Sequence, residues 1–157
     1  MEVRTALKKD TAAILALIRD KAEFDGCLDQ LRSSEDDISN AFFSESPKAK
    51  ALVVESNGEV IGIATYYDIY STFIAKPGIW LDDLYVHESY RQTGAGKALM
   101  KALCQIAKDS GCGRIDWIVA RDNTNGRQFY DSIGAHIFEE VRHSRLDENA
   151  IDQLLHA

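Results

Sequence analysis

The chain has 157 residues, of which 45% are hydrophobic, so it can bury one core, and its length predicts a single domain over residues 1–157. Its formal net charge of -7 argues against a nucleic-acid partner, because a phosphate backbone is bound by a local excess of Lys and Arg. It has no apolar run near the roughly 18 residues of a membrane span and no N-terminal secretory signal, so we expect a cytoplasmic protein without a membrane partner.

The N-terminal part predicts one strand and two helices. Residues 3–6 are typical of a short strand. Asp10 follows as the N-cap of a helix whose apolar residues recur at helical spacing as far as Phe24. Ser34 and Asp37 have the spacing of a capping box, which predicts a second, short helix.

The middle of the chain predicts three strands. Residues 51–55 and 60–67 are rich in strand-forming residues and flank Asn57-Gly58, a strong signal for a tight hairpin turn. Residues 68–78 contain Ser, Thr, Lys, Pro and Gly with little periodicity, so we expect a loop there. Residues 79–86 then form the third strand.

The remaining elements alternate between helices and strands. They are a helix over residues 96–110, a strand over 114–119, a helix over 124–133, a strand over 136–146 and a tail helix ending near Leu155. The complete order, β-α-α-β-β-β-α-β-α-β-α, predicts an α+β fold, a mixed sheet with helices on both faces.

A glycine-rich turn, Arg91-Gln92-Thr93-Gly94-Ala95-Gly96, stands directly before one of these helices. Its glycines lack Cβ atoms, so the backbone can approach a ligand closely and direct successive N–H groups at it. The helix N-terminus adds unpaired donors and the positive end of its dipole. The turn predicts a site for a phosphate or pyrophosphate, although a turn without a ligand fits this short pattern equally well.

The segment V-x-x-x-Y-R-Q-T-G-A-G, residues 86–96, resembles the acetyl-CoA signature of the GNAT superfamily, R/Q-x-x-G-x-G/A. A second segment, in which Asn123, Gly126, Phe129 and Tyr130 precede Gly134-Ala135, resembles the family's N-x-x-(small)-x-x-F-Y-x-x-x-G. The resemblance implies a GNAT fold, with a central, twisted, mostly antiparallel mixed sheet. It also implies an N-acetyltransferase that uses acetyl-CoA and releases coenzyme A.

The resemblance further implies a cofactor lying where two strands splay apart. Its pyrophosphate would bind the backbone of the glycine turn, its pantetheine arm would pair with a strand, and Asn123 would hydrogen-bond it. Tyr130 would protonate the departing thiolate, although a tyrosine at this point of an amphipathic helix is also typical of a core aromatic. The residues implied to hold the cofactor are Leu84, Tyr85, Val86, Arg91, Gln92, Thr93, Gly94, Ala95, Gly96, Lys97, Asn123 and Tyr130.

Asp82 and Asp83 stand together in the otherwise hydrophobic strand W-L-D-D-L-Y-V. An alkyl ammonium has a pKa of about 10, so a nearby carboxylate would bind it and accept its proton. Consecutive strand residues point to opposite faces, so we expect only one of the two acids to face the acetyl group directly. A single Asp there would equally suit a strand edge or bulge, paired with an Arg.

Over nearly its whole length the chain is similar to the diamine and polyamine acetyltransferases, the spermidine/spermine and thialysine N-acetyltransferase group. The segments L-I-R-D-K-A-E-F-D and Y-S-T-F-I-A-K-P-G-I-W-L-D-D-L-Y-V carry this similarity. It implies that Asp82 is the water-linked general base and that Asp25 and Asp83 are acids that bind the substrate. With Glu23, these residues would form an acidic groove for a small cationic amine.

The same similarity narrows the acceptor. Ser71 and Phe73 replace an acid and a tryptophan of the animal spermidine/spermine enzymes, which weakens the case for a long polyamine. A shorter diamine or a lysine-like amine fits the pattern. Related acetyltransferases are commonly homodimers, so the resemblance also implies a homodimer.

Other functions fit part of the pattern. A GNAT enzyme for an aminoglycoside, an amino acid or a protein N-terminus would carry the same cofactor motifs. A coenzyme A-binding module without turnover is a second alternative, and a nucleotide-phosphate binder, which leaves the second motif unexplained, is a third.

The three cysteines and four histidines have no metal-binding spacing, so we expect no metal cofactor and no disulfide framework.

Overall fold

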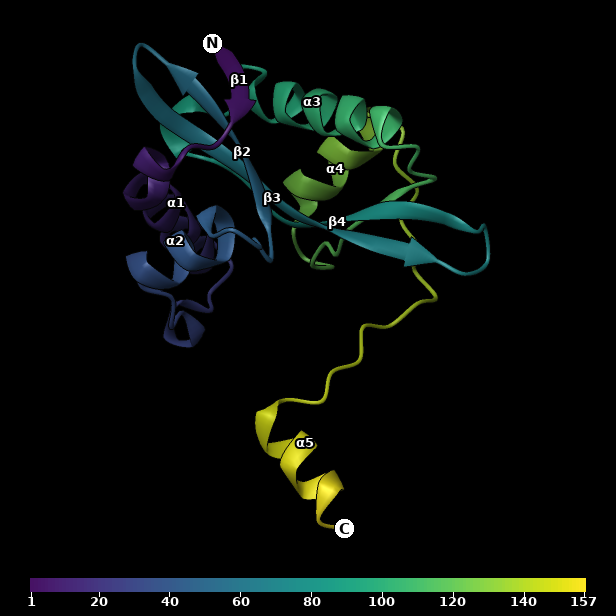
Figure 1. Ribbon diagram of the computed structural model, residues 1–157. Helices are drawn as coiled ribbons and strands as arrows, with labels where there is room; N and C mark the ends of the chain where they lie inside the picture. Colours follow the sequence, from purple (N-terminus) through teal and green to yellow (C-terminus); the bar gives the residue numbers. More distant parts are fainter. The chain divides into compact units, whose positions relative to one another are not determined.

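A five-stranded sheet forms the centre of the first of two units into which the chain divides, Met1–Ile118 and Val119–Ala157. The computed structural model describes all of residues 1–157 and orders the strands β1-β2-β3-β4-β5 (Figure 1). They are β1 (Glu2–Thr5), β2 (Lys50–Ser56), β3 (Glu59–Ser71), β4 (Lys76–Val86) and β5 (Ile115–Asp116). Strands β1 to β4 pair antiparallel and β5 is parallel to β4, which confirms the predicted mixed, mostly antiparallel sheet.

Helices cover both faces of this sheet. On one face α1 (Thr11–Phe24) and α2 (Glu35–Phe43) share a core with alternate residues of the strands. That core contains Ala6, Ile14, Leu17, Ile38, Ala51, Val53, Ile63 and Tyr85. Leu52 and Val54 are buried too and point to the other face, because side chains alternate along a strand. There α3 (Ala95–Asp109) contacts β1 to β4 (Figure 1). Each fully buried Leu, Ile or Val contributes roughly 1.5–3 kcal/mol.

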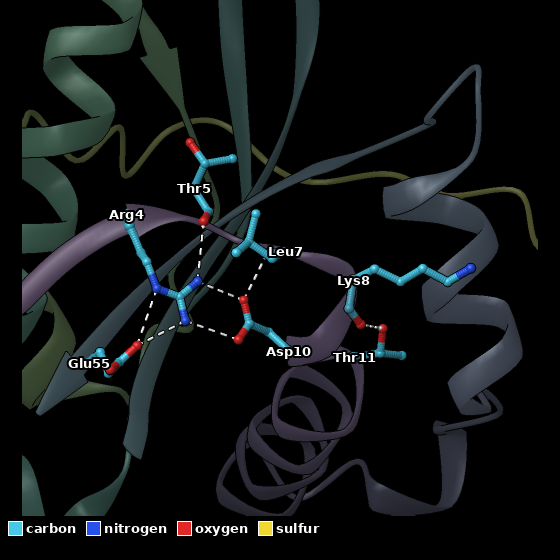
Figure 2. A network of polar contacts seen from close by, with 7 residues as sticks. All are labelled: Arg4, Thr5, Leu7, Lys8, Asp10, Thr11 and Glu55. Carbon is cyan, nitrogen blue, oxygen red and sulfur yellow. Dashed lines mark hydrogen bonds and ion pairs between the residues drawn. The ribbon is translucent and has the colours of Figure 1, made fainter. Parts of the chain in front are cut away.

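The start of α1 is fixed by an ion-pair network (Figure 2). Helix α1 begins after Asp10, as predicted, but the Asp10 side chain does not cap it. A short 3-10 helix, η1 (Lys8–Asp10), precedes α1, and the Asp10 carboxylate instead accepts the Leu7 N–H at 2.7 Å and two hydrogen bonds from Arg4, at 2.7 and 3.0 Å. Arg4 also bonds Glu55 at 2.9 Å, so β1, β2 and the entry to α1 are tied together. Asp10 is thus the N-cap residue of α1 as predicted, but its carboxylate bonds Arg4 and the Leu7 N–H and not the first N–H groups of α1.

Two local turn predictions are confirmed. Ser34 and Asp37 form a reciprocal capping box at the start of α2. Asn57 and Gly58 join β2 to β3 with φ values of 53° and 83°, the positive values that a type I′ hairpin turn requires.

The loop predicted over residues 68–78 is mostly strand. β3 continues to Ser71 and β4 begins at Lys76, and the two pair as far as Ser71↔Lys76. This part of the hairpin extends beyond the central part of the sheet, so most of its side chains are exposed and the apolar alternation that marks a half-buried strand is absent. Only residues 72–75 connect the strands.

The second unit contains α4 (Thr124–Ser132) and α5 (Glu148–Leu155), close to the predicted helices. The strand predicted over residues 136–146 is not formed. A strand requires a neighbour for its backbone hydrogen bonds, and this unit contains no other strand. None of the helices in the structure combines the length and the apolar character needed to cross a bilayer.

Candidate active site

Asp82 lies at a β-bulge in the ladder between β3 and β4. Thr65 pairs with Asp83 and Tyr66 pairs with Leu81, so Asp82 has no partner of its own across the ladder. A bulge disrupts the regular alternation of side chains and redirects them. Asp82 and Asp83 both line one pocket. That only one of them faces the acetyl group directly stays a prediction.

This pocket has a volume of about 390 Å³ and lies between the two helices α1 and α2 and the strands β3 and β4. Its apolar residues are Ile18, Ile38, Ala41, Phe42 and Ala49. Its polar residues are Ser33, Asp37, Thr65, Tyr66, Tyr67, Asp82 and Asp83. Apolar walls with a few acids suit a small molecule that combines an alkyl chain with a cationic group.

Asp83 is held from two sides. Its Oδ2 accepts a hydrogen bond from the Thr65 hydroxyl at 2.7 Å, and its own N–H donates to the Thr65 Oγ1 at 3.0 Å. Its Oδ1 lies 3.5 Å from the Lys21 Nζ. Thr65 is buried, so this reciprocal pair fixes the direction of the Asp83 carboxylate. Sequence reasoning missed Thr65, because its pairing with Asp83 depends on the register of two separate strands.

Asp82 has a different environment. Neighbouring side chains remove part of its hydration and raise its pKa above the ordinary value, and the negative charge of Asp83 adds to this. The Trp80 indole N–H and the Lys21 ammonium act in the opposite direction but do not outweigh it. Its side chain remains exposed to solvent, so water can reach it. A carboxylate with a raised pKa is a stronger proton acceptor than an ordinary one.

Asp25 joins this group through Lys21. It follows the last residue of α1, one helical turn after Lys21, and its Oδ2 lies 2.6 Å from the Lys21 Nζ. Burial alone would lower the pKa of Lys21, but Asp25 and Asp83 outweigh it and raise that pKa, so the side chain is an ammonium at neutral pH. The structure thus brings Asp25 and Asp83 together around one lysine. The i,i+4 spacing of Lys21 and Asp25 is the signal in the sequence that indicates this pairing.

The glycine turn precedes α3 as predicted. It follows the 3-10 helix η3 (Glu88–Tyr90), and Gly94 is the N-cap of α3 with a φ of 91°, a left-handed conformation that favours glycine. The first backbone hydrogen bond inside α3 runs from the Ala98 N–H to the Gly94 carbonyl. The N–H groups of Ala95, Gly96 and Lys97 precede it and can bind an anion. A Cβ atom at Gly94 would meet nothing within 4 Å, so backbone conformation, and not crowding, demands the glycine.

The strand before this turn has an open edge. β5 pairs with β4 only at Ile79↔Ile115 and Trp80↔Asp116, so residues 81–86 have no paired strand on that side. The backbone of Leu84, Tyr85 and Val86 can therefore bond to an extended ligand that carries amide groups. Together with the anion site at the start of α3, this edge fits a long molecule with a pyrophosphate and an amide-containing arm, as coenzyme A has.

Arg91 connects this turn to α1. Its guanidinium lies over the Phe24 ring at 4.7 Å and over the Tyr85 ring at 5.5 Å, and its Nε is 3.4 Å from the Val86 carbonyl. The arginine of the predicted signature is thus held by aromatic contacts.

Asn123 and Tyr130 lie in the second unit. Asn123 is the N-cap of α4, and its Oδ1 accepts the Gly126 N–H at 2.9 Å. A Cβ atom on Gly126 would lie 2.7 Å from the Asn123 Nδ2, which explains the small residue at that point of the motif. Asn123 therefore has a structural role that the sequence did not reveal. Tyr130 is half-buried in α4, with its ring centroid 5.4 Å from that of Phe129. No group of three or more His, Cys, Asp or Glu side chains is placed to hold a metal ion.

Comparisons with known proteins identify the family and the fold. Residues 14–135 match the family model described as "Acetyltransferase (GNAT) family". A thialysine N-epsilon-acetyltransferase of Bos taurus is 34% identical over 147 residues, which cover 88% of this chain and 86% of that protein. An L-ornithine N5-acetyltransferase of Arabidopsis thaliana is 33% identical over 112 residues, 70% of this chain. The match spans only about half of that relative, 49% of its length.

Among solved structures, an integron cassette protein from the mobile metagenome of V. cholerae superposes with a TM-score of 0.81 at 27% sequence identity. The match covers 99% of this chain and 98% of that protein. The two chains therefore share the whole fold.

Proposed function

The chain belongs to the acetyltransferase (GNAT) family, an enzyme family that uses acetyl-CoA, and on that premise we propose that it acetylates the primary amine of a diamine, polyamine or lysine-like small molecule. The observation that carries this proposal is the pocket between α1, α2, β3 and β4, whose wall contains Asp82 at a bulge. The relatives of this chain include an L-ornithine N5-acetyltransferase and a thialysine N-epsilon-acetyltransferase, and these names support an acceptor with an alkyl amine.

The cofactor would bind along the open edge of β4 and at the start of α3. The backbone of Leu84, Tyr85 and Val86 would pair with the pantetheine arm, and the turn from Arg91 to Lys97 would bind the pyrophosphate. Asn123 would add a hydrogen bond. When bound, acetyl-CoA supplies an activated acetyl group that a neutral amine attacks directly, forming the C–N bond as the C–S bond breaks.

Asp82 would bind the ammonium of the acceptor and take its proton, directly or through a water molecule, because its carboxylate is exposed and has a raised pKa. Asp83, held by Thr65, would contribute negative charge to the same pocket. Tyr130 would donate its hydroxyl proton to the departing sulfur. The proton that the amine loses and the proton that the sulfur gains then balance.

We also propose that residues 1–157 act as one acetyltransferase domain and that the enzyme is a homodimer, on the resemblance to the diamine and polyamine acetyltransferases. Light scattering coupled to size-exclusion chromatography measures the mass directly. The mass of one chain would contradict the dimer.

The test of the activity is the release of free thiol from acetyl-CoA by the purified protein. The acceptor panel contains diamines, polyamines, thialysine, lysine and one aminoglycoside. We expect turnover with the diamines or lysine analogues. Turnover with the aminoglycoside alone would contradict the proposed acceptor class and indicate an aminoglycoside acetyltransferase. Binding of acetyl-CoA without turnover of any amine would indicate a coenzyme A-binding module.

A further inference from the structure

The Lys21 side chain carries an ammonium group that lies beside Asp25 and Asp83, two of the acids predicted to bind the acceptor. Its Nζ lies 2.6 Å from Asp25 and 3.5 Å from Asp83, and these three side chains are each between one fifth and about one third exposed. The three come from α1, from the residue after it and from β4. One ammonium between two carboxylates compensates half of their charge and leaves the group with a net charge of about −1.

The acids of the site therefore fall into two groups. Asp25 and Asp83 are already paired with Lys21, and Asp83 is also bonded by Thr65. Asp82 forms no salt bridge in the structure. Asp37, the third acid that lines the pocket, also forms no salt bridge, but its Oδ2 accepts hydrogen bonds from the Ser34 N–H and hydroxyl at the start of α2. Asp82 is therefore the acid of the pocket that is held neither by Lys21 nor by a helix cap, and an acceptor ammonium can pair with it.

We propose that Lys21 is a specificity-determining residue that occupies a cation subsite between Asp25 and Asp83. The pocket then binds one ammonium of the acceptor at Asp82, beside the partly compensated charge of Asp83. A second ammonium at the Asp25–Asp83 subsite would have to displace Lys21 or approach it against like-charge repulsion. Lys21 thus favours acceptors of single positive charge, zwitterionic amino acids with a side-chain amine among them, over dications of the same length. This inference rests on the proposed acetylation of small amines.

A purely structural role for Lys21, joining α1 to β4, predicts something different. Removing a structural lysine would change activity towards all amines by the same factor. Removing the occupant of a cation subsite exposes Asp25 and Asp83 to the acceptor and changes the ratio between two amines. The ratio of kcat/KM values therefore separates the two roles.

The experiment compares cadaverine with pentylamine, which have the same carbon chain and differ in the second ammonium. The kcat/KM of each is measured by thiol release for the wild type, Lys21→Met, Lys21→Arg and Lys108→Met. Methionine keeps the volume of the lysine stem without its charge, and Lys108 is an exposed lysine in the last turn of α3. We expect Lys21→Met to raise the cadaverine-to-pentylamine ratio about five- to tenfold. Lys21→Arg and Lys108→Met should keep the ratio of the wild type.

An unchanged ratio in Lys21→Met, with activity retained, would overturn the specificity role of Lys21 while leaving the proposed function in place. Absence of turnover with every amine in the wild type would instead contradict the proposed function, and this inference with it. Should Lys21→Met fail to fold, as judged by circular dichroism, Lys21→Gln carries the same prediction.

Discussion

Lys21 of α1 and Asp83 of β4 face each other across the junction of helix and sheet, with 3.5 Å between Nζ and Oδ1. Asp83 is therefore held by a helix on one side and by Thr65 of the neighbouring strand on the other. The adjacent Asp82, displaced by the bulge, keeps its carboxylate exposed to solvent. Two consecutive acids thus acquire different environments, and we infer different roles for them.

Thr65→Val should weaken amine binding without abolishing catalysis. The substitution keeps the shape of the side chain but removes the hydroxyl that bonds both the Asp83 carboxylate and its N–H. We expect the KM for the amine to rise several-fold, kcat to remain within about twofold, and the free energy of unfolding to fall by about 1–3 kcal/mol. Steady-state kinetics and urea unfolding measure these effects. Thr72→Val at the exposed hairpin tip is the control, and equal KM values in both variants would contradict the role given to Thr65.

Tyr130→Phe should lower kcat by about 10²-fold, because removal of a general acid typically costs 10²–10⁴-fold. The affinity for acetyl-CoA, measured by calorimetry, should be nearly unchanged. Tyr70→Phe, in the outer part of the β3–β4 hairpin and 64% exposed, should behave as the wild type. A kcat in Tyr130→Phe equal to that of Tyr70→Phe would exclude Tyr130 as the proton donor.

Gly94→Ala should affect both stability and cofactor binding. Alanine at a φ of 91° is strained and should lower the free energy of unfolding by about 1 kcal/mol or more. It should also raise the Kd for coenzyme A, because relief of the strain moves the N–H groups at the start of α3. Gly58→Ala is a matched control, since Gly58 has a φ of 83° and is equally uncrowded, in a hairpin turn that we do not place at the cofactor. If both variants lose stability but bind coenzyme A as the wild type does, the turn is not the pyrophosphate site.

Asp10→Asn should destabilise the protein at neutral pH and hardly at all in acid. The hydrogen bonds from Arg4 lower the pKa of Asp10 in the folded protein, and the N–H of Leu7 contributes to this despite the opposing effect of burial. A carboxyl with a lowered folded pKa contributes stability that is present above its unfolded pKa of about 3.9 and lost as the pH falls through the folded value.

We therefore expect a loss of about 2 kcal/mol in the free energy of unfolding at pH 7, measured by denaturant unfolding. The difference from the wild type should shrink towards pH 3. Asp152→Asn on exposed α5 should cost almost nothing. If the difference in the free energy of unfolding between Asp10→Asn and the wild type did not change with pH, the ion pair between Asp10 and Arg4 would not be the source of the stability.

Local signals in the sequence predicted much of this fold. Asn57-Gly58, the capping box of Ser34 and Asp37, and the glycine turn before α3 each depend on a few adjacent residues, and the structure confirms all three. The family resemblance, which rested on two short motifs, is confirmed by the match over residues 14–135.

The errors arose where distant residues decide the structure. The bulge at Asp82 depends on the register between β3 and β4, which hydrophobic alternation does not specify at a polar pair. Residues 136–146 had the composition of a strand but find no partner strand in their unit. The contact between Lys21 and Asp83 joins a helix to a distant strand, so no local pattern in the sequence indicates it.

The most direct test of the account is the pH dependence of kcat/KM for a diamine or lysine analogue in the wild type, Asp82→Asn and Asp68→Asn. Asp68 is an exposed acid of β3 that pairs with Lys50 and does not line the pocket, so its variant should match the wild type. We predict that Asp82→Asn lowers kcat/KM at neutral pH by about 10²-fold and moves the optimum to higher pH, where the amine is already deprotonated. A profile for Asp82→Asn that coincides with that of the wild type would contradict the claim that Asp82 takes the proton from the acceptor.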